Sequence, residues 1–174
     1  MSDQSLRVGD RVPDFILPDQ EGNAVALREL LASRCVVLFF YPKDDSPGCT
    51  AQACSFRDEH QELAEAGACV VGVSSDDAES HRRFAEKHRL PFRLLSDREG
   101  ELRKRFGVPR TLGLIAGRVT YVIDSQGIVR HIFSSQLRTR QHAEEALTLV
   151  RSLRAADSAP SSETSDMPGH GNRT

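Results

Sequence analysis

Residues 36–54 read VVLFFYPKDDSPGCTAQAC, and this stretch decides the fold around it. Its first five residues are apolar and predict a buried strand, whereas the residues after Cys49 recur at helical spacing. The polar segment in between contains proline and glycine, which mark the change from strand to helix. Cys49 is therefore expected where a helix begins, in a positive field and near unpaired backbone N–H groups. This setting favours the thiolate, which is the reactive form of cysteine.

The start of this helix can be predicted residue by residue. Ser46 suits the N-cap and Pro47 suits the first helical position, so Cys49 falls in the first turn. Gly48 lets other groups approach the backbone closely. A helical projection places Cys49 on the apolar side of the helix and Cys54 about 140° away from it. Cys49 should face the core or a pocket, and Cys54 should face another way.

The five-residue step from Cys49 to Cys54 has a mechanical consequence. Along an ideal helix the two Cα atoms are roughly 8.6 Å apart, whereas a disulfide tolerates at most about 7 Å. The two thiols therefore cannot form a disulfide while the helix is intact. If they do form one, the first helical turns must unwind, and local unfolding becomes an obligatory step of the redox cycle.

Outward from this segment, strand and helix signals alternate along the chain. We expect strands at residues 15–17, 25–27, 35–40, 68–73, 92–95, 119–123 and 128–133, with hairpins joining the first two and the last two. We expect helices at residues 50–65, 78–88, 99–106 and 140–155, the third ended by Gly107 and the fourth capped by Thr139. This order predicts an α/β fold with a central mixed sheet covered on both sides, similar to the thioredoxin-like architecture.

Composition restricts the class of protein. A chain of 174 residues with a net charge of -2 suggests one domain with a sizeable core, and it has no basic stripe or tail for nucleic acid. No apolar run approaches the length of a membrane span, and no apolar signal segment is visible near Met1. Four cysteines in a chain of this length do not form a disulfide scaffold, so we expect a cytoplasmic protein with working thiols.

The composition changes once, near the end of the chain. Residues 157–174 read DSAPSSETSDMPGHGNRT and contain almost no large apolar side chains. Such a segment buries too little to offset its ordering entropy. We therefore expect one folded domain at residues 1–156, followed by a disordered polar tail.

Simpler explanations exist for the polar and thiol residues. Both cysteines of the pair could be packing residues, although a packing cysteine does not need the polar Gly/Pro turn. A zinc site needs about four ligands, and the nearest further candidate, His60, lies on the apolar helix face. We expect packing roles for Cys35 and Cys69, and satisfied packing for three histidines, His60, His81 and His88. Solvation accounts for the charges in the loop before Cys49, at Lys43, Asp44 and Asp45.

The segment from Tyr41 to Thr50, with Cys54 to Asp58, closely resembles the active-site stretch of the peroxiredoxins, and most of all the Q type, also called bacterioferritin comigratory protein. The similarity covers roughly residues 8–153 and includes the later GRVTYVID at 117–124. It implies a thioredoxin-like thiol peroxidase without metal, haem or flavin. Cys49 matches the peroxidatic cysteine, which becomes a sulfenic acid. Cys54 matches the resolving cysteine, which forms a disulfide with it.

The resemblance implies three further site positions. Pro42 matches the proline that shields the peroxidatic cysteine. Ser46 stands where the family usually has threonine. Its hydroxyl can bond both thiolate and peroxide, but the missing methyl leaves its rotamer less fixed. Arg118 matches the arginine beside the thiolate, where a fixed cation stabilises negative charge on the departing oxygen.

The resemblance also implies substrates and partners. We expect hydrogen peroxide and small organic hydroperoxides as substrates, thioredoxin or a similar dithiol as reductant, and a monomer. An alternative function is a redox sensor or holdase that binds other proteins when Cys49 is oxidised. A general disulfide oxidoreductase is a third reading, and the absence of a CxxC pair counts against it.

Overall fold

A five-stranded mixed sheet forms the centre of the computed structural model, which describes residues 5–33, 35–111, 113 and 115–159. The strand order is β5 (Arg93–Ser96), β4 (Ala68–Ser74), β3 (Cys35–Phe40), β8 (Val119–Asp124) and β9 (Val129–Ser134). β4 is parallel to β3 and β5, and β8 is antiparallel to β3 and β9. The whole of β3 is buried, as its uninterrupted apolar run predicts.

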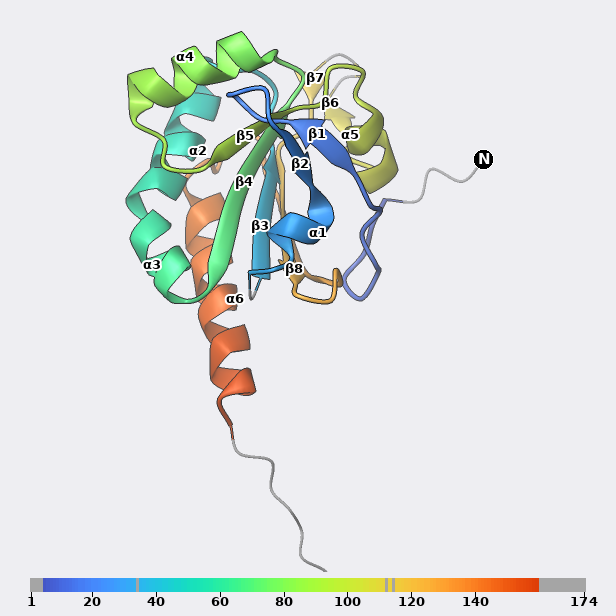
Figure 1. Ribbon diagram of the computed structural model, residues 1–174, viewed down its shortest axis with the longest axis vertical. Coiled ribbons are helices and arrows are strands. Elements are labelled where there is room, and N and C mark those ends of the chain that lie inside the picture. Colours follow the sequence, from blue (N-terminus) through green and yellow to red (C-terminus); the bar gives the residue numbers. More distant parts are fainter. Residues whose placement is uncertain (1–4, 34, 112, 114, 160–174) are drawn as a thin grey trace, which may run out of the picture.

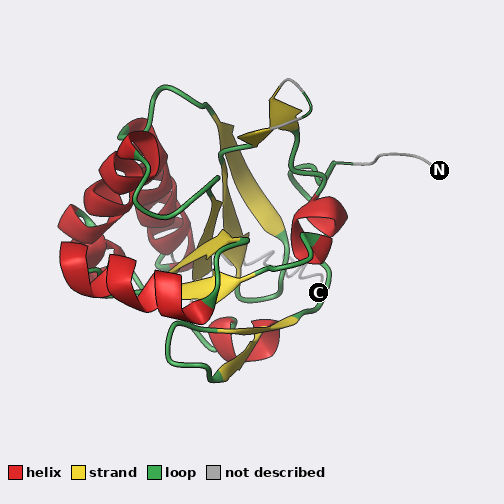
Figure 2. Cartoon of the chain, turned by 90° about the horizontal axis from the view of Figure 1, so that it is seen from above, coloured by secondary structure: helices red, strands yellow, loops and turns green. Residues whose placement is uncertain are grey.

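Helices cover both faces of this sheet. Figure 1 shows on one side α2 (Pro47–Asp58), α3 (His60–Glu65), α4 (Ala78–His88) and α6 (Gln141–Asp157). The other face packs against α1 (Leu27–Leu30), α5 (Glu101–Phe106) and the N-terminal hairpin. Figure 2 shows the same separation from above. The two core clusters meet alternate residues of β3, with Val37 and Phe39 on one face and Leu38 and Phe40 on the other. The predicted fold class is therefore confirmed.

The predicted hairpins are present, with small shifts at their ends. β1 (Ile16–Pro18) pairs antiparallel with β2 (Ala24–Ala26), one residue away from the predicted bounds. The turn between β8 and β9 is closed by the Gly127 N–H, which donates to the Asp124 carbonyl at 3.0 Å. A further short hairpin pairs β6 (Arg110–Thr111) with β7 (Ile115–Ala116), and no sequence signal predicted it.

The helices differ from prediction at their ends. The helix expected through residue 65 begins at Pro47, the predicted first helical position, but it is divided at Glu59 into α2 and α3. The helix expected at 99–106 begins only at residue 101, because Gly100 has φ 70 and ends the preceding turn. Gly107 terminates that helix as predicted, with φ 67. The Thr139 cap is wrong, because Arg140 is the N-cap of α6 and no side chain caps it.

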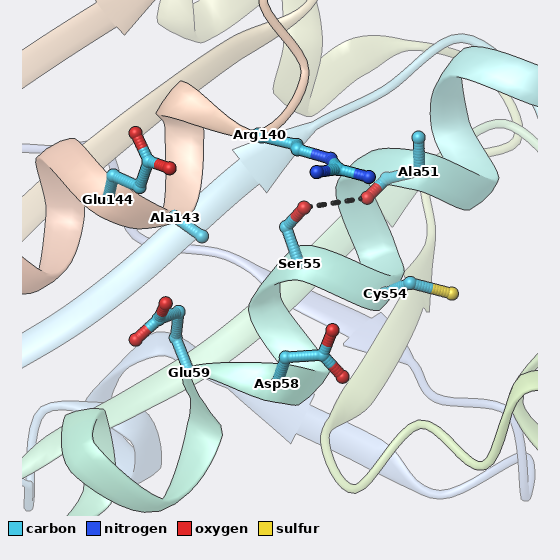
Figure 3. Close-up of a pocket in the computed structure, with 8 residues that line it drawn as sticks. All are labelled: Ala51, Cys54, Ser55, Asp58, Glu59, Arg140, Ala143 and Glu144. Carbon is cyan, nitrogen blue, oxygen red and sulfur yellow. Dashed lines mark hydrogen bonds between the residues drawn. The ribbon is translucent and has the colours of Figure 1, made fainter.

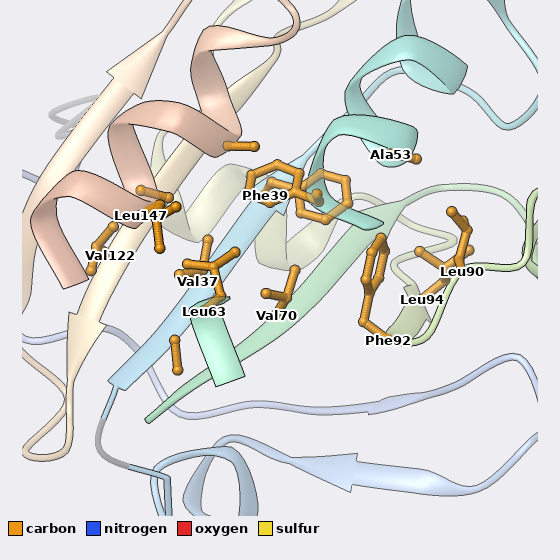
Figure 4. Packing of buried hydrophobic residues seen from close by; sticks show 14 of the residues in the cluster. Val37, Phe39, Ala53, Leu63, Val70, Leu90, Phe92, Leu94, Val122 and Leu147 are labelled. Carbon is orange, nitrogen blue, oxygen red and sulfur yellow. The ribbon is translucent and has the colours of Figure 1, made fainter. Parts of the chain in front are cut away.

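The core beneath α2 is aromatic. Phe56 of α2 stacks on Phe39 of β3 with ring centroids 4.5 Å apart, and both side chains are fully buried. Phe92 meets Phe39 edge-on at 5.8 Å. Figure 4 shows Phe39, Phe92 and Ala53 together in this cluster. Burial of a phenylalanine side chain contributes about 1.5–3 kcal/mol, so the second half of α2 is held firmly against the sheet.

The last helix extends to the start of the predicted polar tail. α6 ends at Asp157, one residue beyond the predicted domain, and residues 160–174 of the predicted tail lie outside the described residues. Within the part of the chain that the structure describes, none of the helices has both the length and the apolar character needed to cross a membrane.

Candidate active site

Cys49 lies in the first turn of α2, where the sequence placed it. Ser46 is the N-cap with extended backbone, Pro47 is the first helical residue, and the Thr50 N–H donates to the Ser46 carbonyl at 2.8 Å. The Cys49 side chain is 1% exposed and belongs to the core cluster. The thiol is thus buried at a helix N-terminus, where the dipole and free N–H groups favour negative charge.

Arg118 is the cation that touches this thiol. It lies directly before β8, and its Nη2 donates to the Cys49 sulfur at 3.5 Å. Its side chain is buried, and Nη1 donates to Gln52 Oε1 at 2.6 Å. Gly48 makes the approach possible, because a Cβ at that position would lie 2.9 Å from Arg118 Nη2. The structure thus brings Arg118 and Cys49 together, as the resemblance predicted.

Sequence reasoning did not find Gln52. This residue has no exposed surface and sits three positions after Cys49, on the same side of α2. It fixes the guanidinium of Arg118 in the orientation that contacts sulfur. Its Nε2 and the Arg118 Nε are buried without a hydrogen-bond partner among the described residues. The i, i+3 spacing from Cys49 was the available signal.

A second buried arginine, Arg103 of α5, was also missed. Its Nη2 donates to the Tyr41 carbonyl at 3.0 Å, and its Nη1 donates to the Gly117 carbonyl at 3.3 Å. It therefore joins the end of β3 to the residue before Arg118. Burial lowers the pKa of Arg103, and the opposing charges of Asp97 and Cys49 act to raise it. The thiol thus lies in the field of two buried arginines.

Ser46 and Pro42 lie in the loop between β3 and α2. The Ser46 hydroxyl donates to the Lys43 carbonyl at 2.9 Å, and it makes no capping bond to α2. Ser46 thus occupies the N-cap position through its backbone alone. Its oxygen keeps free lone pairs, so the hydroxyl can still accept a bond from a peroxide. Pro42 is half-buried, one residue after the buried Tyr41.

Cys54 faces away from this site. It is half-buried and borders a groove between α2 and α6, whose other lining residues are Ala51, Ser55, Asp58, Glu59, Arg140, Ala143 and Glu144. Figure 3 shows the Cys54 sulfur pointing away from Arg140, the N-cap of α6, and from Glu144 of α6. Cys49 and Cys54 are both free thiols. Because α2 is helical across both positions, Cys49 and Cys54 lie on different sides of an intact helix.

Comparisons with known proteins show the family of this chain. The AhpC/TSA family matches residues 8–132. The chain belongs to this family and is a Q-type peroxiredoxin. It is 47% identical to peroxiredoxin Q, chloroplastic, of Oryza sativa subsp. japonica over 146 residues, which cover 83% of this chain and 67% of that protein. The Sedum lineare protein of the same name is also 47% identical, over 84% of this chain and 78% of its own length.

Solved structures place the peroxiredoxin in the same group. The crystal structure of peroxidoxin BcpB from Mycobacterium tuberculosis is 43% identical with a TM-score of 0.79, covering 84% of this chain and 97% of that one. The bacterioferritin comigratory protein of Xanthomonas campestris, studied for its alkyl peroxide reduction activity, is 29% identical with a TM-score of 0.73. The match covers 80% of this chain and 92% of the Xanthomonas campestris chain. The protein is thus a thiol peroxidase with a thioredoxin-like fold.

The other two thiols of this peroxiredoxin lie in strands. Cys35 is buried in β3, and Cys69 is half-buried in β4. Burial raises the pKa of the Cys69 thiol, so the thiolate is disfavoured there. Both positions fit the packing role predicted for them.

One expectation about the active-site loop is wrong. Solvation does not account for the charge of Asp44. Its carboxyl group is buried and contacts the side chains of Tyr41, Ser80 and His81. Its neighbour Asp45 is exposed as expected, and hydrogen bonds from Lys87 and then His88 lower its pKa. His81 is fully buried with both ring nitrogens in contact with partners, which agrees with satisfied packing. The Asp44 partners Ser80 and His81 are far away in the chain, so the residues next to Asp44 gave no sign of these contacts.

Proposed function

We propose that Cys49 is the peroxidatic cysteine of this thiol peroxidase. The observation that carries the proposal is the contact of a buried cation, Arg118, with a buried thiol at a helix N-terminus. The Cys49 thiolate attacks one oxygen of the hydroperoxide. A sulfur–oxygen bond forms while the oxygen–oxygen bond breaks, and the departing oxygen takes a proton to leave as water or an alcohol. Cys49 is left as a sulfenic acid.

The surrounding groups suit the movement of charge in this step. Negative charge passes from sulfur to the departing oxygen, which Arg118, held at the sulfur, and the N–H groups of the first turn of α2 can stabilise. Thiolate formation alone does not explain a fast reaction, because nucleophilicity falls as the thiol becomes more acidic. The rate gain comes from holding the peroxide in line between sulfur and these donors. Pro42 shields the thiol, and the Ser46 hydroxyl accepts a bond from the bound peroxide.

We propose Cys54 as the resolving cysteine. Its thiol attacks the sulfenic sulfur of Cys49, a disulfide forms, and water leaves. Since α2 separates the two residues in its helical form, the first turns unwind before this bond closes. A dithiol reductant of the thioredoxin class then returns two electrons and restores both thiols. A nearby Cys54 also limits further oxidation of the sulfenic acid.

The finer features of the function are proposals as well. The substrates are hydrogen peroxide and small organic hydroperoxides, supported by the alkyl peroxide activity named for the Xanthomonas campestris relative. We propose a cytoplasmic monomer; four cysteines in a chain of 174 residues are too few for a disulfide scaffold, which suits a reducing compartment. The rice and Sedum lineare relatives are named as chloroplastic proteins.

A coupled assay tests the proposal. The protein is mixed with thioredoxin, its reductase, NADPH and hydrogen peroxide, and NADPH oxidation is followed for the wild type, Cys49→Ser and Cys54→Ser. We expect repeated turnover in the wild type and none in Cys49→Ser. A redox sensor or holdase, the alternative, does not need repeated turnover and is not favoured by the family. Unchanged peroxide loss in Cys49→Ser would show that the assignment is wrong.

The role of Cys54 has its own test. After one equivalent of peroxide, peptide mapping should find Cys49 linked to Cys54. The Cys54→Ser variant should still reduce one equivalent of peroxide but should then accumulate sulfenic acid. A link from Cys49 to Cys69, or between two chains, would contradict the assignment.

A further inference from the structure

The loop between β3 and α2 is anchored by a buried carboxylate. Asp44 is 6% exposed. One of its oxygens accepts the Tyr41 hydroxyl at 2.6 Å. The other lies 2.8 Å from both Ser80 Oγ and His81 Nδ1, which come from α4. Three side chains, two of them on another element, thus converge on a single loop residue.

The backbone of the same residue is anchored too. The Asp44 N–H donates to Asp76 Oδ2 at 2.9 Å, and that oxygen also accepts the Ser74 hydroxyl at 2.7 Å. Ser74 is the last residue of β4, which is the neighbour of β3 in the sheet. The loop is therefore tied to β4 and to α4 through one residue, in the middle of the stretch between Pro42 and Ser46.

The contacts of His81 show how protons are arranged in this cluster. Its Nε2 lies 3.1 Å from the Leu95 carbonyl, which can only accept, so Nε2 carries a proton. Its Nδ1 faces the Asp44 carboxyl, and one proton must lie between these two groups for the contact to be attractive. Burial, and then the charge of Asp44, raises the pKa of Tyr41 well above its ordinary value, so Tyr41 stays a donor. The Asp44–His81 pair thus shares one proton and is neutral overall.

We propose that Asp44 and His81 are positioning residues of the peroxidase reaction, because their buried contact fixes the loop that carries Pro42 and Ser46 against the start of α2. The inference rests on the proposed role of Cys49. Asp44 lies two residues from both Pro42 and Ser46, so a shift of its anchor moves both toward or away from the bound peroxide. A displacement of about 1 Å at a reacting centre can cost roughly 100-fold in rate.

Substitutions of Asp44 separate geometry from charge. Asp44→Ala leaves the Tyr41 hydroxyl and the His81 ring without their shared partner, and the loop loses its anchor. Asp44→Asn keeps the shape. Its amide oxygen accepts from Tyr41, and its amide nitrogen donates to the neutral Nδ1 of His81 and to Ser80. The asparagine variant thus reproduces the neutral, proton-sharing pair and should retain the loop position.

The experiment compares two reactions of the same thiol in the full-length protein. Stopped-flow mixing with hydrogen peroxide measures the reaction that needs an oriented substrate, and alkylation by iodoacetamide measures the access and reactivity of the Cys49 thiolate alone. We expect Asp44→Ala to lower the peroxide rate roughly 10- to 100-fold while alkylation stays within about threefold or becomes faster. Asp44→Asn should remain within about threefold of the wild type in both reactions.

A matched control lies next to Asp44. Asp45→Asn removes the negative charge that pairs with Lys87 and His88 and should change the peroxide rate less than about twofold, since exposed ion pairs contribute little. The inference is overturned if Asp44→Ala keeps the wild-type peroxide rate, if it slows both reactions equally, or if Asp44→Asn fails as badly as Asp44→Ala. Should Asp44→Ala not fold, His81→Leu is measured in the same way. Failure of the proposed function differs, because Cys49→Ser would then keep its peroxide reaction.

Discussion

Arg118 Nη2 lies 3.5 Å from the Cys49 sulfur, although the two residues are 69 positions apart in the chain. The contact depends on two neighbours on α2. Gly48 leaves room for the guanidinium, and Gln52 accepts a hydrogen bond from its other terminal nitrogen. The first six residues of α2 thus supply the thiol, the space for the cation and the group that orients it. Substitutions of Gly48 and Gln52 alter this contact while Arg118 and Cys49 stay in place.

Gly48→Ala should separate activity from stability. The added Cβ would lie 2.9 Å from Arg118 Nη2, so the buried guanidinium must move away from the sulfur. Alanine is a better helix former than glycine by up to about 1 kcal/mol, which offsets part of that cost. We expect the peroxide rate in stopped-flow mixing to fall by roughly tenfold or more with little change in melting temperature. Ala51→Gly, on the same helix, is the control: it should lower the melting temperature and leave the peroxide rate unchanged. Equal peroxide rates for Gly48→Ala and the wild type would refute the steric argument.

Gln52→Ala should affect both stability and activity. The substitution removes the acceptor of a 2.6 Å bond from Arg118 and leaves a buried donor unpaired, which costs about 1–3 kcal/mol. The guanidinium also loses the group that orients it toward Cys49. We expect a lower free energy of unfolding in urea and a slower peroxide reaction. Gln52→Glu restores an acceptor and should recover most of the stability, while its negative charge opposes thiolate formation and keeps the reaction slow.

The disulfide form should show an unwound α2. Residues 47–58 form a continuous helix in the structure, and Cys49 and Cys54 cannot bond across it. We expect faster amide exchange at residues 50–55 after oxidation, with residues 141–157 of α6 unchanged as an internal reference. Equal protection of residues 50–55 in both redox states would contradict the unwinding step.

His142 should make stability depend on pH. Burial lowers its pKa from 6.5 to about 4, helped by the nearby charge of Arg118, and its ring bonds Thr120 and the Ser135 carbonyl. Below pH 6.5 His142 binds a proton in the unfolded chain, whereas in the folded protein it does so only near pH 4. The stability from this group is therefore complete above pH 6.5 and falls by up to about 3 kcal/mol as the pH drops to about 4.

Urea unfolding at several pH values measures this effect. His142→Leu removes the titrating group, so its free energy of unfolding should change less between pH 6.5 and 4 than that of the wild type. Parallel pH profiles for the two proteins would mean that His142 does not control the acid limb. Carboxylates with lowered pKa, such as Asp45, lose most of their contribution below their ordinary value of 3.8, and this loss is common to both proteins.

Patterns among neighbouring residues predicted the helices and strands well, but they could not predict contacts between residues far apart in the chain. The apolar run before Tyr41 and the Ser46–Pro47 helix start are properties of neighbouring residues, so the sequence was enough to place Cys49. Arg118 was found through a motif resemblance, since its own neighbours suggest nothing special. The partners of Asp44 lie 36 and 37 positions away on α4. A charged residue in a polar loop looks solvated until the packing of another helix over it is known.

The end of α2 also has an effect on which thiol moves. Phe56 is stacked on Phe39, and Arg57 Nη1 donates to the His88 carbonyl at 2.8 Å, so the chain immediately after Cys54 is fastened to β3 and α4. Fraying from the N-terminus of α2 must break the hydrogen bonds from Arg118 to Cys49 and Gln52, but it leaves the stacked Phe56 and the Arg57 contact intact. In the proposed cycle we therefore expect Cys54 to stay in place. Cys49, with its newly bound oxygen, then moves away from Arg118 toward the half-buried thiol of Cys54.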